Sequence, residues 1–106
     1  MTLQFRQALA EYVDAALCRL DMVKTSNFRV NDAVERIYDQ LVSIQPAEVD
    51  DIPLQPLGTW QRTPADWLVS AADIIGYAAR TWADPVIDAP TFRQIADELR
   101  DLAKSL

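Results

Sequence analysis

The chain has 106 residues and, with 16 acidic and 10 basic side chains, a formal net charge of −6 at pH 7. Half of its residues are apolar, which excludes an intrinsically disordered chain, and its length is that of one domain. A single cysteine excludes a disulfide-stapled mini-protein, and no apolar run approaches the ~20 residues of a membrane span. Because the N-terminus lacks the pattern of a signal peptide, we expect a soluble cytoplasmic protein.

The first predicted helix covers about residues 2–23. Thr2 is a suitable N-cap, and Arg19 and Lys24 place positive charge near the C-terminal end, where it suits the helix dipole. One face carries apolar side chains at three- and four-residue spacing, namely Phe5, Leu9, Tyr12, Val13, Ala16, Leu20 and Val23. The polar residues 25–27 predict a loop after this helix.

The second predicted helix covers about residues 31–45. We expect it to begin at Asn31 or Asp32, because both are good N-caps and Asp32 has the spacing of a capping box with Glu35. Pro46 should end it, since the residue before a proline is disfavoured in the helical region. Its apolar face consists of Val34, Ile37, Tyr38, Leu41 and Ile44.

The segment of residues 46–62 contains three prolines and a glycine, which exclude a long helix. It also carries large apolar side chains, among them Val49, Ile52 and Trp60, so it does not have the composition of a solvated linker. We therefore expect an ordered, extended connection laid across the molecule, long enough to allow helices on either side of it to run parallel.

The third predicted helix, over about residues 63–83, has the clearest start, with Thr63 as N-cap and Pro64 at the first helical position. Its main apolar face consists of Trp67, Leu68, Ala71, Ile74, Ile75, Ala78 and Trp82. A second stripe of small residues consists of Ala65, Ala72, Gly76 and Ala83. Because a helix that is apolar on two sides is typical of the interior, we expect this helix to be central and its small stripe to pack within the chain.

The fourth predicted helix covers about residues 89–105, after the break at Asp84-Pro85. Its apolar seam consists of Phe92, Ile95, Leu99, Leu102 and Leu106. No segment shows the alternation of a strand. The sequence thus predicts an all-α fold, a single-domain four-helix bundle with a long proline-rich connection between its second and third helices.

Absent residue types restrict the chemistry. Without histidine there is no imidazole base for a catalytic triad, and with only Gly58 and Gly76 there is no glycine-rich phosphate loop. One cysteine and no histidine disfavour a zinc site. We therefore expect no catalytic residues, no cofactor and no metal, although an enzyme that uses carboxylates alone or a divalent cation remains an alternative.

The negative net charge argues against direct nucleic-acid binding, which needs a basic surface. Near the connection of the first two helices, Arg19, Lys24, Arg29 and Arg36 alternate with Asp21, Asp32 and Glu35. From this alternation we expect no patch of one sign there. The acidic surface expected for the chain as a whole instead suits a basic protein partner, or simply keeps the protein soluble.

Two connections carry acidic residues without basic ones: Glu48, Asp50 and Asp51 in the first, Asp84 and Asp88 in the second. We predict that these residues, with Trp60 as an exposed aromatic anchor, bind a partner protein with a basic surface. Solvation of the loops and a core position for Trp60 are the alternatives. The leading hypothesis is a non-enzymatic regulator, such as an inhibitor or immunity-type protein that can mimic the charge of a nucleic acid.

An alternative interface lies on the first helix, where Ala15, Cys18 and Met22 fall on the side away from Leu9. Such a stripe would let a structural or adaptor subunit bind a partner or form a homodimer. A redox role for Cys18 is not expected, because neighbouring carboxylates raise a thiol pKa.

Overall fold

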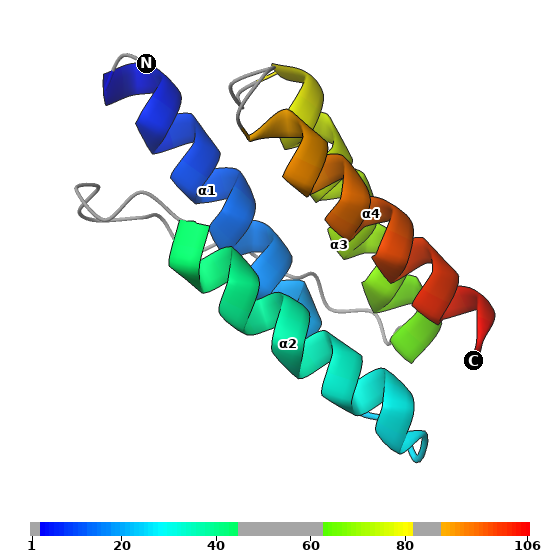
Figure 1. Cartoon of the computed structure of the whole chain (residues 1–106). Helices are drawn as coiled ribbons and strands as arrows, with labels where there is room; N and C mark the ends of the chain where they lie inside the picture. Colours follow the sequence, from blue (N-terminus) through cyan, green and yellow to red (C-terminus); the bar gives the residue numbers. More distant parts are fainter. Residues whose placement is uncertain (1–2, 45–62, 82–87) are drawn as a thin grey trace.

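Figure 1 shows the computed structural model of the protein, which describes residues 3–44, 63–81 and 88–106. For residues 3–7 it describes the backbone only. The described residues form four helices. They are α1 (Leu3–Leu20), α2 (Phe28–Ile44), α3 (Pro64–Thr81) and α4 (Ala89–Lys104). The described residues form no strand, and the helices pack into a bundle, so the predicted all-α four-helix fold is confirmed. The proline-rich connection lies outside the described residues.

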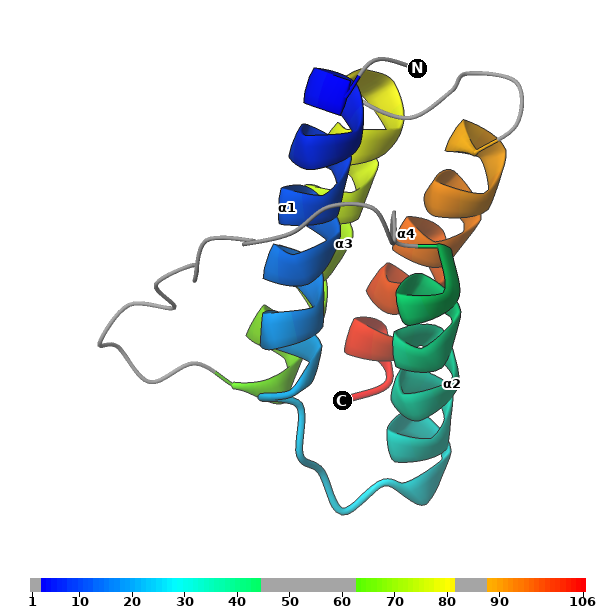
Figure 2. The same ribbon diagram turned by 90° about the vertical axis from the view of Figure 1, so that its left-hand side faces the viewer.

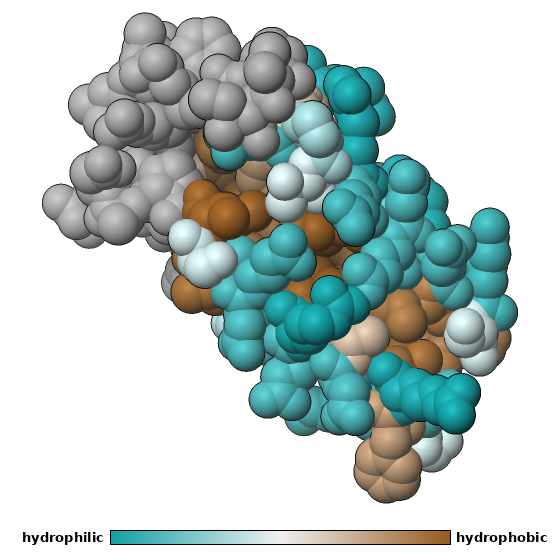
Figure 3. Space-filling model, in the orientation of Figure 1, coloured by the Kyte–Doolittle hydropathy of each residue, from teal (hydrophilic) through white to brown (hydrophobic). Residues whose placement is uncertain are grey.

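The helices sit at the corners of a four-sided bundle (Figures 1 and 2). Helix α3 packs extensively on α4 and α1, whereas α2 touches α1 and α4 more sparingly. Helices α2 and α3 run in the same direction at opposite corners, as a long connection between them permits (Figure 1). In Figure 3, apolar side chains show between polar ones on the face that α2 and α4 share.

The core is apolar throughout the described part of the chain, with no buried charged or polar side chain. Its largest fully buried side chains are Leu20, Ile37, Leu41, Leu68, Ile75, Phe92 and Leu99. Trp67 is 5% exposed and belongs to this core, Ile74 packs against it, and Trp82 lies outside the described residues. Ala72 and Gly76 are buried too, so these two residues of the predicted small stripe pack within the chain, whereas Ala65 is half-buried and Ala83 lies outside the described residues. Helix α3 packs on both α1 and α4, as expected of a central helix.

Two predicted boundaries are wrong, both at the connection of α1 and α2. Helix α1 ends at Leu20, although Val23 still reaches the core. Helix α2 begins at Phe28, and its N-cap is Asn27, whose Oδ1 accepts the backbone N–H of Arg29 at 3.0 Å and of Val30 at 3.3 Å. The earlier start places Val30, only 1% exposed, in the core.

The same correction applies to the capping residues that the sequence favoured for α2. Asn31 and Asp32 lie inside the helix. The Asn31 side-chain amide instead donates to the backbone carbonyl of Thr25 at 2.9 Å, while the Thr25 hydroxyl donates to Asn31 Oδ1, also at 2.9 Å. These bonds hold the loop against the first turn of α2.

The start of α3 is as predicted. The Thr63 hydroxyl accepts the backbone N–H of Asp66 at 3.2 Å, and Asp66 Oδ2 accepts the backbone N–H of Thr63 at 3.2 Å. This reciprocal capping satisfies two backbone donors that a helix start leaves free. Helix α4 follows Asp88, whose side chain makes no capping hydrogen bond, and Leu106 lies beyond its end.

Candidate functional site

Most of the acidic residues proposed from the sequence lie outside the described residues. These are Glu48, Asp50, Asp51 and Asp84, together with Trp60. Asp88 is described and lies directly before α4, where it is half-buried and its carbonyl accepts the backbone N–H of Phe92 at 3.1 Å. These residues remain a predicted partner-binding set.

The alternative stripe on α1 is only partly exposed. Ala15 is 7% exposed, Met22 is 46% exposed in the turn after α1, and Cys18 is half-buried between them. Burial raises the pKa of the Cys18 thiol, and Asp14 and Asp21 raise it further. The thiol is therefore kept in its weakly nucleophilic neutral form.

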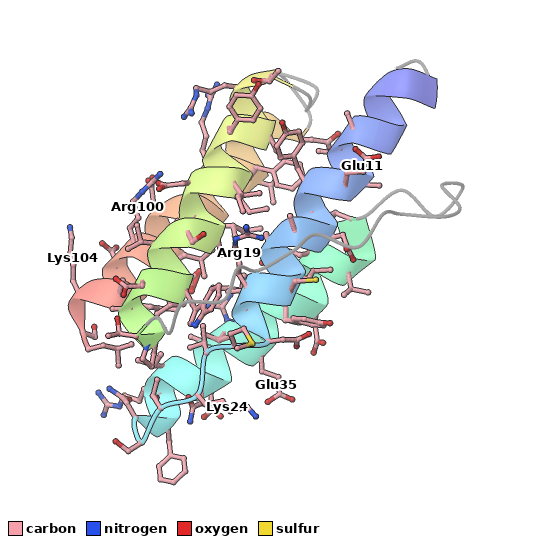
Figure 4. The ribbon with its side chains drawn as sticks, turned by 180° about the vertical axis from the view of Figure 1, so that it is seen from behind. Glu11, Arg19, Lys24, Glu35, Arg100 and Lys104 are labelled. Atoms are coloured by element: carbon pink, nitrogen blue, oxygen red, sulfur yellow. The ribbon has the colours of Figure 1, made fainter. Side chains whose placement is uncertain are left out.

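A groove runs between the C-terminal end of α1 and the first half of α2, with a volume of about 470 Å³. Its lining residues are Leu20, Asp21, Val23, Lys24, Thr25, Asn31, Val34, Glu35, Tyr38 and Asp39. Lys24 and Glu35 lie at its mouth, one from the loop and one from α2 (Figure 4). On α2 the lining positions recur at three- and four-residue spacing, which is why one helix face supplies half of the groove.

The groove has an apolar floor and an acidic rim. Leu20 and Val34 are 2% and 7% exposed and form its base. Asp21, Glu35 and Asp39 are exposed at its edge, where Lys24 is the basic residue among the lining side chains. A concave surface with an apolar base and a charged rim is typical of a site that binds a side chain of opposite charge.

The pKa of the Tyr38 phenol reports the same negative surroundings. Burial raises this pKa first, and Asp21, Cys18, Asp14 and Asp39 each raise it further. The carboxylates of α1 and α2 therefore act on one point in the groove, although they are far apart in the sequence.

The structure sorts the alternating charges of this region by side. The Arg19 guanidinium turns toward α3, where Nε donates to the Ser70 hydroxyl at 2.9 Å. Arg36 turns toward α4 and forms an ion pair with Glu98. Of the alternating residues, Asp21, Lys24 and Glu35 line the groove, and with Asp39 the carboxylates there outnumber the basic side chains three to one.

An exposed aromatic residue stands in the first turn of α2, the helix that supplies half of the groove lining. Phe28 is 80% exposed and lies three residues before Asn31, a position one helical turn away. Sequence analysis did not single out Phe28, because it placed this residue in the loop before the helix. Nothing in the neighbouring sequence indicates that the Phe28 side chain is exposed.

The described ranges contain no group of three or more cysteine, aspartate or glutamate side chains arranged to hold a metal ion. None of the described helices combines the length and apolarity needed to cross a bilayer. Comparisons with protein-family models, curated sequences and solved structures found no match.

Proposed function

We propose that this protein is a small, acidic, non-enzymatic regulator that binds another protein through a basic surface of that partner, in the manner of an inhibitor or an immunity-type protein. The observation that supports this most is the acidic rim of the α1–α2 groove, from which Arg19 and Arg36 are turned away. The negative charge at the rim of the groove would favour a basic side chain of the partner.

The groove suits a lysine or arginine side chain of the partner. The aliphatic stem would lie on Leu20 and Val34, and the cationic end would meet Asp21 and Asp39 at the rim. The ring of Tyr38 adds a surface on which a cation is favoured. Binding of this type gains speed and orientation from charge and weakens as salt rises.

The acidic residues of the two connections belong to the same proposal. Glu48, Asp50, Asp51, Asp84 and Asp88 are five of the 16 acidic side chains of the chain and lie in two stretches without a basic residue. Asp88, at the start of α4, lies at the end of the bundle away from the groove, so it would meet a different part of the partner (Figure 1). Acidic stretches of this kind would also occupy a nucleic-acid-binding site on the partner by imitating phosphate charge.

An NMR titration of the ¹⁵N-labelled protein with a short arginine- and lysine-containing peptide tests the proposal. The shifts should map to the lining residues of the groove and weaken as salt is added. In the variant Glu35→Gln/Asp39→Asn, affinity should fall several-fold more than in the control Asp97→Asn/Asp101→Asn, which removes the same charge from α4.

Two outcomes would contradict the proposal. Equal losses in both double variants would show that the peptide responds to net charge alone. Shifts spread over the surface without a maximum at the groove would show that the groove has no special role.

A further inference from the structure

We propose that a second site, an arginine-lined pocket between α3 and α4, binds a tetrahedral oxyanion of the phosphate type. The pocket has a volume of about 220 Å³ and is lined by Gly76, Arg80, Arg93, Ala96, Asp97 and Arg100. The α3–α4 edge lies opposite the α1–α2 edge in the four-sided bundle. The inference is therefore independent of the proposed function of the acidic groove.

Helix geometry brings three guanidinium groups to this pocket. Arg93 and Arg100 are seven residues apart on α4 and so share one face, and Arg80 follows Gly76 by one turn on α3. A methyl group at Gly76 would lie 3.6 Å from a terminal nitrogen of Arg80 and 3.6 Å from one of Arg100. Side chains from two helices thus converge over the glycine, and Arg100 projects from this side of α4 in Figure 4.

The floor of the pocket is small and closely packed. Gly76 is buried and Ala96 is 1% exposed, so the guanidinium groups stand above a base without bulky side chains. The pocket stays open above this base because Gly76 has no side chain and Ala96 carries only a methyl group. The volume is below the roughly 300–1,000 Å³ of sites for drug-sized ligands. It therefore suits a single anionic group.

The charges of the pocket are unbalanced in favour of an anion. Arg100 is held by Asp73 at 3.2 Å and by Asp97 at 3.7 Å. Within the described part of the chain, Arg80 and Arg93 have no carboxylate within 4.0 Å. Three guanidinium groups thus face two carboxylates, and both carboxylates are engaged by Arg100.

A phosphate-type oxyanion is complementary to these guanidinium groups. Guanidinium groups are planar, stay charged at all working pH values and present paired N–H donors that match two oxygens of a phosphate. Arg80 and Arg93 would supply these donors from two helices, while Arg100 is kept in place by its carboxylates. A bound dianion would also relieve the repulsion between like charges gathered in one pocket.

The experiment follows arginine side-chain N–H signals by NMR during titration with inorganic phosphate and, separately, with O-phosphoserine, against chloride at matched ionic strength. Saturable shifts of Arg80 and Arg93 are expected with phosphate. Tighter binding of O-phosphoserine would identify a phosphomonoester as the source of the group, and tighter binding of inorganic phosphate would identify the free ion.

The variant Arg80→Gln/Arg93→Gln should weaken binding at least about tenfold, because it removes two of the three guanidinium groups that donate charge-assisted hydrogen bonds to the anion. The control Arg29→Gln/Arg36→Gln removes the same charge from α2 and should change affinity about twofold or less. Circular dichroism of both variants checks that helix content is kept. Shifts that do not saturate, or equal weakening in the two variants, would overturn the proposal.

Discussion

Replacement of Trp67 by alanine should remove a large part of the protein's stability. Trp67 is 5% exposed and packs in the core formed by all four helices. The change removes about 150–200 Å² of buried apolar surface, which at about 25 cal/mol per Å² corresponds to about 4–5 kcal/mol. Because a domain of this size has a free energy of unfolding of about 5–15 kcal/mol, the variant should be close to its folding limit.

Thermal unfolding and urea unfolding, each followed by far-UV circular dichroism, measure this effect. The melting temperature should fall by at least about 15 °C, given about 4–8 °C per kcal/mol for small domains. Val69→Ala is the matched control, because Val69 is on the same helix but 41% exposed, and it should change stability by less than about 1 kcal/mol. If Trp67→Ala does not fold, Trp67→Leu retains part of the contact and should unfold at an intermediate urea concentration. A Trp67→Ala protein as stable as the control variant would refute the assignment of Trp67 to the core.

Two further predictions concern the helix starts and the alkaline pH range. Thr63→Ala should destabilise the protein by about 1 kcal/mol, because it leaves a backbone donor of α3 without its acceptor, whereas Asp32→Ala inside α2 should have little effect; thermal unfolding compares them. The pKa values of Cys18 and Tyr38 are raised in the folded protein above their ordinary values of 9.0 and 10.0. The unfolded chain therefore loses these protons first, and stability should decline as the pH rises past those values. In urea titrations over alkaline pH, Cys18→Ala and Tyr38→Phe should each flatten that decline, and an unchanged slope in both would contradict the raised pKa values.

The sequence alone determined the helices and most of the core. Apolar spacing placed Leu41, Ile75 and Leu99 on buried faces, and the Thr63 start was predicted correctly. These features are local, because a helix face and a cap depend on residues within a few positions of one another. The start of α2 was not local in this sense, because the sequence favoured Asn31 or Asp32 as the cap and the structure uses Asn27. Several polar residues compete there, and burial of Val30 against other helices decided it.

The two candidate sites were decided by the tertiary structure. Asp21 and Tyr38 meet because α2 folds back along α1, and Arg80 and Arg93 meet because α4 folds back along α3. Asp97 lies one turn after Arg93 on α4, yet it pairs with Arg100, which also reaches Asp73 on α3. A long charged side chain has several partners within reach, and the energies of exposed pairs are small. Packing of the helix backbones therefore selects which charges face each other, and this selection is what separates the acidic groove from the basic pocket.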